Sequence, residues 1–246
     1  MSILIKHRFL LGAVLIAVAA FLHGPKVALS ALETCATGAR SADPLSLYGN
    51  EIVFSVMRNG EPIGVHRVNF DRNGDELIVA SRFEAEVKFL FLTAFEYLYE
   101  SKAVWRNGCM VELKATTDDN GDKSRVLARL ADGQLKIEGP AGTIRGTPGL
   151  LPSNHWNSGI LESNQVLNTI TGTVASINIA DLGEKPVVVN AQPASARHYV
   201  YSGDLQTEVW YDDSGRWVKM RFRAEDGSSI EYICQKCRFD GASGPA

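Results

Sequence analysis

Turn sequences recur at short, regular intervals along most of this chain, and they constrain its fold more than any other feature. Asn-Gly and Asp-Gly pairs, the strongest short signal for a two-residue hairpin, occur at residues 59–60, 107–108, 120–121 and 132–133. Between the turns, apolar and polar residues alternate with the period of two that marks a strand with one buried face. Many short strands separated in this way are typical of an all-β sandwich or barrel.

The stretch at residues 77–87 alternates most clearly, with acidic and basic side chains on one face. The face predicted to be buried carries Leu77, Val79, Ser81, Phe83, Ala85 and Val87. About 11–12 such strands are predicted, nearly all joined by hairpins, which makes a single antiparallel meander. A sheet of that size must curl or close to bury its apolar face and protect its edges. We therefore expect an all-β domain curled into an incomplete barrel.

The strand pattern is interrupted between residues 139 and 160, where five glycines and three prolines occur. Glycine and proline in such numbers favour a loop over regular structure. Residues 160–167 leave room for one short helix. We expect the segment 139–167 to lie across or beside the opening of the barrel.

The N-terminus has the form of a secretory signal. Lys6 and Arg8 precede an apolar run at residues 9–22, and small residues suitable for cleavage follow at 28–30. The alternative is a transmembrane anchor, but the run has 14 residues, whereas a span needs about 20. We therefore expect a periplasmic protein without a transmembrane segment after cleavage. The expected parts are a signal peptide at 1–30, a flexible segment at 31–47, a β domain at 48–238 and a disordered tail at 239–246.

The charge of the mature chain argues against some partners. Cleavage after residue 30 removes three of the 25 lysines and arginines and none of the 28 acidic residues, leaving 22 against 28 and a net charge of −6. Nucleic acid binding requires a basic face, and anionic lipid head groups attract basic segments. The charge therefore predicts no nucleic acid partner and no general attraction to anionic lipid head groups.

The four cysteines favour disulfide bonds, because an even number in an exported chain usually forms them. They are Cys35, Cys109, Cys234 and Cys237, and three pairings are open. The spacing of the last two is also that of a redox pair or half a zinc site. The redox interpretation is weakened because this pair ends a predicted strand instead of opening a helix. The zinc interpretation lacks a second close pair. Glu33 argues against lipidation of Cys35.

Several motifs resemble a bacterial exported family known as domain of unknown function 6134. They occur at residues 56–64, 104–108, 117–121, 151–157 and 210–219, so the resemblance covers roughly residues 50–233. The expected architecture also resembles the curled sheets of periplasmic lipoprotein carriers and of some envelope-integrity proteins. Architecture does not carry function, and the family implies no activity, so the resemblance assigns no catalytic residue.

The most apolar part of the mature chain is the candidate ligand-binding segment. It contains Phe89, Phe91, Phe95, Tyr97 and Tyr99. A helix over its last part is conceivable, but aromatic residues and resumed alternation favour a bent pair of strands. A curled sheet can hold an apolar ligand against such residues. The alternative is that they fill a solid core.

His155 and Trp156 lie in the long irregular segment, where binding residues often occur. They are further candidates for the ligand-binding site, as a polar group and an aromatic wall at the mouth of a pocket. The alternative is structural: Trp156 plugs an apolar gap, and Ser153 or Asn154 caps a short helix.

Catalytic and metal-binding motifs are weak. His66 and His198 are isolated within strands, and no closely spaced histidine pair exists. Residues 118–122 lack the bidentate acid that completes a calcium loop. No Gly-x-Ser-x-Gly motif is present. We expect no cofactor, no metal and no catalytic residue.

These observations favour a non-enzymatic protein that binds an apolar or amphipathic envelope molecule, or a partner protein, inside a curled sheet. The first alternative is a structural or chaperone-like envelope factor with a filled core. The second is a hydrolase that uses His155. A continuous apolar cavity would favour the first hypothesis, and a carboxylate or nucleophile beside His155 would favour the last.

Overall fold

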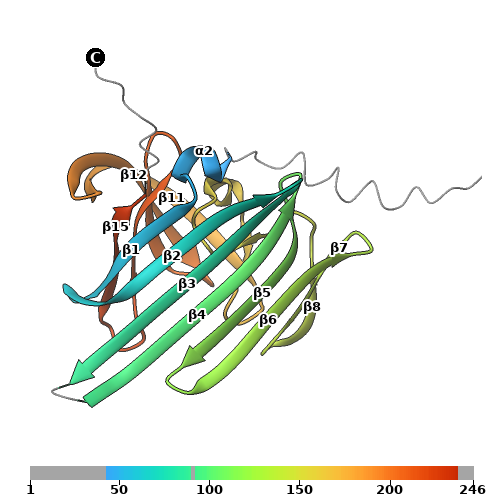
Figure 1. Cartoon of the computed structure of the whole chain (residues 1–246), viewed down its shortest axis with the longest axis horizontal. Coiled ribbons are helices and arrows are strands. Elements are labelled where there is room, and N and C mark those ends of the chain that lie inside the picture. The colour runs from blue at the N-terminus through green and yellow to red at the C-terminus, as the bar shows by residue number, and fades with distance from the viewer. Residues whose placement is uncertain (1–42, 90–91, 238–246) are drawn as a thin grey trace, which may run out of the picture.

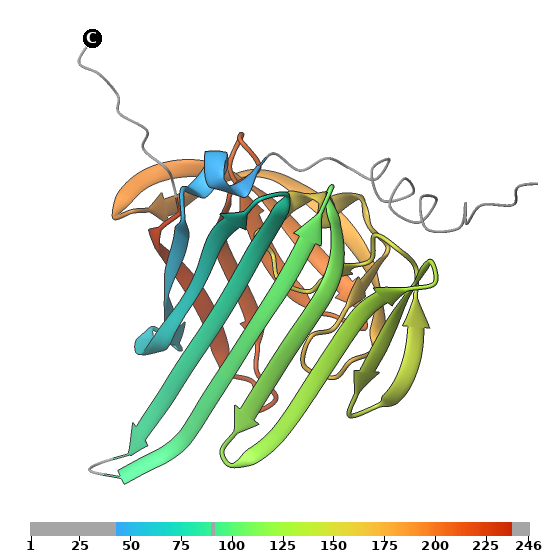
Figure 2. The same ribbon diagram turned by 45° about the vertical axis from the view of Figure 1, so that its right-hand side comes forward.

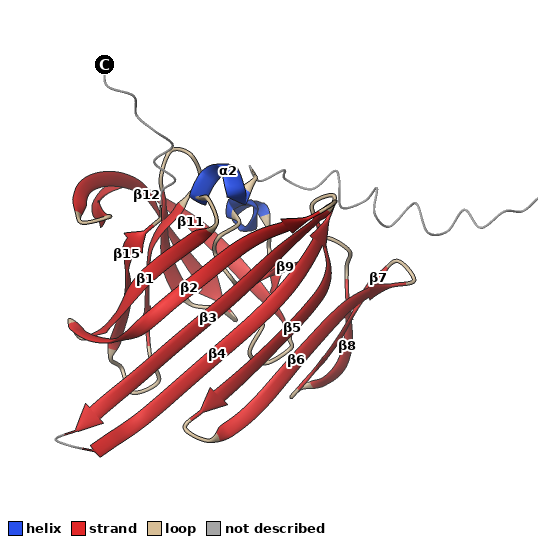
Figure 3. Cartoon of the chain, viewed as in Figure 1, coloured by secondary structure: helices blue, strands red, loops and turns tan. Residues whose placement is uncertain are grey.

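The computed structural model describes residues 43–89 and 92–237 of the chain. One sheet of fifteen strands makes up nearly all of it, in the spatial order β8-β7-β6-β5-β4-β3-β2-β1-β15-β14-β13-β12-β11-β10-β9 (Figures 1 and 3). The expected signal peptide, the tail, Cys35 and Phe91 lie outside the described residues. The strands are β1 (Glu51–Arg58), β2 (Glu61–Asn73), β3 (Glu76–Phe89), β4 (Leu92–Arg106), β5 (Cys109–Asp119), β6 (Asp122–Ala131), β7 (Gln134–Gly139), β8 (Gly142–Gly146), β9 (Leu151–Pro152), β10 (Gln165–Leu167), β11 (Val174–Val189), β12 (Gln192–Gly203), β13 (Thr207–Tyr211), β14 (Trp217–Arg223) and β15 (Ser229–Lys236).

The expected curled, mainly antiparallel sheet is confirmed. Its predicted turns adopt the left-handed backbone that two-residue hairpins need, with positive φ at Asn59, Asn107, Asn120, Asp132 and at the glycine after each. Each turn sets the register of its two strands, so the inward face continues from one strand to the next.

The strands differ from the expected ones in three respects. The segment 139–167 holds the short strands β8, β9 and β10 and the 3-10 helix η1 (Ser158–Glu162). Strands β9 and β10 pair in parallel, an arrangement that hairpin signals do not reveal. Strand β11 continues through an irregularity between Asp181 and Glu184, where Gly183 has a φ of 73°. Glycine adopts this conformation without steric cost.

The sheet closes on itself at its C-terminal part. Val189 of β11 forms a parallel bridge with Cys234 of β15, so β11 to β15 form a ring. Strand β15 also pairs with β1, and the sheet continues from there as a tall curved wall facing the C-terminal strands (Figure 2). A disulfide joins Cys234 to Cys237 at the closure, as the disulfide interpretation predicts. Cys109 is disulfide-bonded as well.

A short helix, α2 (Pro44–Tyr48), covers one end of the curled sheet (Figure 1). It falls within the stretch for which the sequence predicts no structure. Tyr48 is buried, and its ring stacks on Phe70 with centroids 5.6 Å apart. Its hydroxyl accepts a hydrogen bond from the Trp217 amide at 2.8 Å and donates to the Trp156 carbonyl at 2.9 Å. One side chain thus joins α2, the irregular segment and β14.

Tyr48→Phe is expected to lower the free energy of unfolding by about 2 kcal/mol, because it leaves a buried amide and a buried carbonyl without a partner. Urea unfolding monitored by circular dichroism measures the loss. Tyr199→Phe, at a partly exposed ring of β12, is the matched control and should change stability by less than about 0.5 kcal/mol. Equal stability of the two variants would contradict the role given to the Tyr48 hydroxyl.

Candidate functional site

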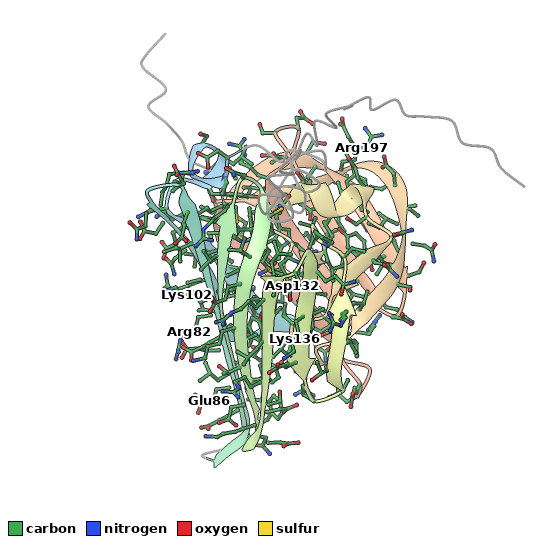
Figure 4. The ribbon with its side chains drawn as sticks, turned by 90° about the vertical axis from the view of Figure 1, so that its right-hand side faces the viewer. Arg82, Glu86, Lys102, Asp132, Lys136 and Arg197 are labelled. Carbon is green, nitrogen blue, oxygen red and sulfur yellow. A yellow bond between two sulfur atoms is a disulfide. The ribbon has the colours of Figure 1, made fainter. Side chains whose placement is uncertain are left out.

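The curled sheet encloses a cavity of about 810 Å³, which its concave face lines mainly with apolar side chains. Pockets that bind small molecules have volumes of roughly 300–1,000 Å³. The residues of β3 predicted to face inward line it from Ser81 to Val87. Charged residues between them point away, and Figure 4 shows Arg82 and Glu86 on the outside of the sheet. Regular alternation in one strand therefore builds both the wall of the cavity and the solvent-facing surface.

Polarity changes along the length of the cavity. The register of β3 and β4 places side chains in successive layers. Toward the β3–β4 hairpin, β3 contributes serine, phenylalanine, alanine and valine, and β4 contributes serine, two tyrosines and phenylalanine. The facing pairs are Ser81 and Ser101, Phe83 and Tyr99, Ala85 and Tyr97, and Val87 and Phe95. On β3 and β4 the wall therefore becomes more apolar toward the hairpin, whereas charged lining residues at the same end come from other elements.

The mouth of the cavity is formed by the end of β1 and by the turn between β14 and β15. Arg58 is the last residue of β1, and its guanidinium forms an ion pair with Asp226 in the turn between β14 and β15. Its Nε also donates to Ser228 Oγ at 3.1 Å. Both charged side chains are partly exposed, so this pair contributes little to stability. It places charged groups beside the opening.

The floor of the cavity is formed by His66 and Ser81 on neighbouring strands, by Asn154 and His155 of the irregular segment, and by Trp217 of β14. The two imidazole centroids lie 5.8 and 5.6 Å from that of the indole. His66 Nε2 lies 2.7 Å from Ser81 Oγ. The Nδ1 atoms of both histidines and Oδ1 of Asn154 are buried and have no hydrogen-bond partner. Such polar atoms cost free energy when they stay unpaired.

Burial keeps both floor histidines uncharged at neutral pH. It lowers the pKa of His155 to about 4. It also lowers the pKa of His66 to about 3, with a smaller contribution from the nearby His155. Desolvation disfavours the protonated form of an imidazole. Each ring therefore offers one N–H donor and one nitrogen acceptor.

The structure brings four of the candidate binding residues to the cavity: Phe95, Tyr97, Tyr99 and His155. Trp156 lies instead in the core, with its ring 5.5 Å from that of Phe70 and 5.4 Å from that of Trp105. This position matches the structural alternative for Trp156. The side chain of Phe89 and all of Phe91 lie outside the described part of the chain.

Sequence reasoning missed His66, Asn154 and Trp217 as lining residues. One signal was available for His66, because it shares the inward face of β2 with Val68 and Phe70. No sequence signal places Asn154 beside it, since the contact joins a strand to a distant irregular segment.

The floor does not have the arrangement of a hydrolase. His66 and Ser81 make the contact of a base–nucleophile pair, but no group among the described residues orients the Nδ1 of His66. A histidine with a pKa of about 3 is also a weak base. His155 contacts the rings of Tyr201 and Trp217, and its pKa shift has burial as its cause. Within the described ranges, no three His, Cys, Asp or Glu side chains are grouped to hold a metal.

The part of the chain that the structure describes contains no helix with the length and hydrophobicity that a membrane span needs. Comparison with curated proteins finds no match. Among solved structures, the chain resembles a β-barrel-like protein of domain of unknown function 1849 from Brucella abortus. That likeness has a TM-score of 0.55 at 10% identity and covers 78% of this chain and 98% of the other, so it supports the fold alone. The profile of a family described as a domain of unknown function matches residues 54–235. The chain therefore belongs to the family of domain of unknown function 6134.

Proposed function

We propose that this protein is a non-enzymatic periplasmic binding protein that holds an apolar or amphipathic molecule in the cavity of its curled sheet. The observation that carries the proposal is the cavity of about 810 Å³ with mainly apolar walls. Transfer of apolar surface from water into such a space is favourable by about 25 cal/mol per Å². The signal-like residues 1–30 support export.

The alternative of a structural factor with a filled core fits the interior less well. A filled barrel packs its inward side chains against one another. Here the inward faces of β3 and β14 both contribute lining residues, among them Phe83 and Met220, to a shared space. Because the interior is hollow, the aromatic residues of β4 line a space in which they can contact a bound molecule.

Filling the cavity is expected to abolish ligand binding while leaving the fold intact. Ala85 is buried in the wall opposite Tyr97, and Ala85→Trp places an indole in the empty space. The affinity for N-phenyl-1-naphthylamine, an uncharged apolar dye that fluoresces in apolar surroundings, should fall about tenfold or more. Fluorescence titration of the dye measures this change.

Ala80→Trp is the matched control for this experiment. Ala80 lies on the same strand but on its opposite face, beside Lys102 and Asn69 of the neighbouring strands. This variant should bind the dye like the unsubstituted protein, and circular dichroism verifies that both variants are folded. If the unsubstituted protein does not bind the dye, or if Ala85→Trp binds it unchanged, the proposal is wrong.

Native mass spectrometry of the protein isolated from a periplasmic fraction tests the proposal in the cell. A stoichiometric lipid or other apolar molecule that organic extraction releases is the expected result. Absence of the protein from that fraction would contradict the localisation, and a ligand-free protein would contradict the carrier function.

A further inference from the structure

We infer that the ligand is a single-chain amphiphile with an uncharged hydrogen-bonding group, and that this group lies at the floor of the cavity against Asn154 and His155. Its apolar chain then extends toward the mouth. The inference rests on the proposed function, and it names the class of ligand and its orientation.

Asn154 and His155, at the floor of the cavity, each carry a polar atom without a hydrogen-bond partner. The side chains of Asn154 and His155 line the cavity, although their residues are 9% and 5% exposed. Oδ1 of Asn154 and Nδ1 of His155 have no hydrogen-bond partner. Most buried polar side-chain atoms in proteins are paired. These two atoms have almost no accessible surface. A ligand group that donates and accepts, such as a hydroxyl or an amide, would therefore bind to the other polar atoms of the same side chains, Nδ2 of Asn154 and Nε2 of His155.

The charged side chains that line the cavity lie at its mouth and not at its floor. Among the described residues, the acidic and basic side chains that line the cavity belong to the ends of β1, β5 and β14 and to the turn after β14. They are Arg58, Asp119, Arg223, Glu225 and Asp226. All of them lie at the mouth. An anionic or cationic head group at the floor would therefore lack a counter-charge in surroundings that desolvate it.

Apolar side chains line the cavity between its floor and its mouth. The side chains of Ala85, Val87, Phe95, Met220 and Phe222 line it. Along β3 and β4 the lining changes from serine at the floor to valine and phenylalanine near the hairpin. An uncharged polar end at the floor and an apolar chain along these residues match this lining.

Displacement of bound N-phenyl-1-naphthylamine by three compounds with the same ten-carbon chain tests the inference. The compounds are decan-1-ol, decanoate and decyltrimethylammonium, each used below the concentration at which it aggregates at pH 7.5. Decan-1-ol should bind most tightly. His155→Phe and, separately, Asn154→Leu should each weaken decan-1-ol about tenfold, as the loss of one buried hydrogen bond predicts. The charged compounds should change less than about twofold, because their head groups stay at the mouth.

Two further variants separate hydrogen bonding from shape. His155→Gln retains a donor and an acceptor and should restore most of the affinity for decan-1-ol. His198→Phe, on β12 and outside the cavity lining, should change none of the three affinities. Dye binding itself should persist in every variant, so a loss of the alcohol preference is distinct from a failure of the cavity to bind.

Three results would overturn the inference while leaving the cavity as a binding site. One is tightest binding by decanoate or decyltrimethylammonium. Another is an unchanged affinity for decan-1-ol in both His155→Phe and Asn154→Leu. The third is an equal fall for all three compounds, which would assign these residues to the shape of the cavity alone. If the unsubstituted protein binds no dye, the proposed function fails as well.

Discussion

Acidification from pH 7.5 to pH 5 is expected to lower the free energy of unfolding by about 2 kcal/mol for each of the two histidines at the cavity floor, His66 and His155. Burial lowers their pKa values from 6.5 to about 3 and about 4 in the folded protein. The unfolded chain, with ordinary imidazoles, therefore binds more protons as the pH falls through 6.5. The free energy of unfolding must then fall as the pH drops from 6.5 toward the folded pKa values. The contribution of the two uncharged histidines is fully present above pH 6.5.

Urea unfolding at a series of pH values between 7.5 and 5 measures this dependence. In this range most carboxylates remain ionised in both states, so the histidines dominate the slope. His155→Phe should remove the contribution of this residue, about 2 kcal/mol over the range. Burial also lowers the pKa of His198, so His198 adds to the slope that remains. Asn154→Leu, which removes a neighbouring buried group that does not titrate, should keep the slope of the unsubstituted protein. A flat profile, or an unchanged slope in His155→Phe, would show that the imidazoles are accessible to protons in the folded state.

Gly64→Ala is expected to destabilise the fold by about 3 kcal/mol, because overpacking against rigid backbone is costly. Gly64 lies in β2 opposite Ala85 of β3. A Cβ there would overlap the carbonyl oxygen of Glu84 and lie 2.8 Å from the Cα of Ala85. Both contacts are to backbone, so relief requires the two strands to separate beside the wall of the cavity. Chemical unfolding measures the loss.

Gly60→Ala separates this steric effect from the general effect of replacing glycine. Gly60 has a φ of 91°, and nothing lies within 4 Å of a Cβ built on it. Its substitution should cost about 1 kcal/mol through backbone strain. If Gly64→Ala costs no more than Gly60→Ala, the close approach of β2 and β3 does not hold in solution.

Much of the wall of the site could be predicted from the sequence. The alternation at residues 77–87 identified which side chains of β3 face inward, and Ser81 and Phe83 lie where it placed them. Alternation reports the direction of each side chain relative to its own strand, which is a local property. Phe95 and Tyr97 could be named because their segment is the most apolar of the mature chain, which is also a local property.

The floor could not be predicted in this way. Asn154 and His155 reach it from an irregular segment whose strands are short and pair partly in parallel. Trp156, the neighbour that looked equally suited to a pocket, packs into the core instead. Backbone direction in such a segment depends on long-range contacts, among them the hydrogen bond from Tyr211 to the His155 carbonyl at 2.9 Å.

Neighbouring residues specify the all-β class, the hairpin turns and the inward face of most strands, because turn conformation and side-chain alternation are local properties. The hollow interior and the two uncharged histidines at its floor are visible in the three-dimensional structure alone. Those properties follow from how far the sheet curls and where β11 meets β15 at Val189 and Cys234. The curvature of the sheet is the sum of small rotations between neighbouring strands, of which there are fifteen. A short stretch of sequence therefore does not specify it.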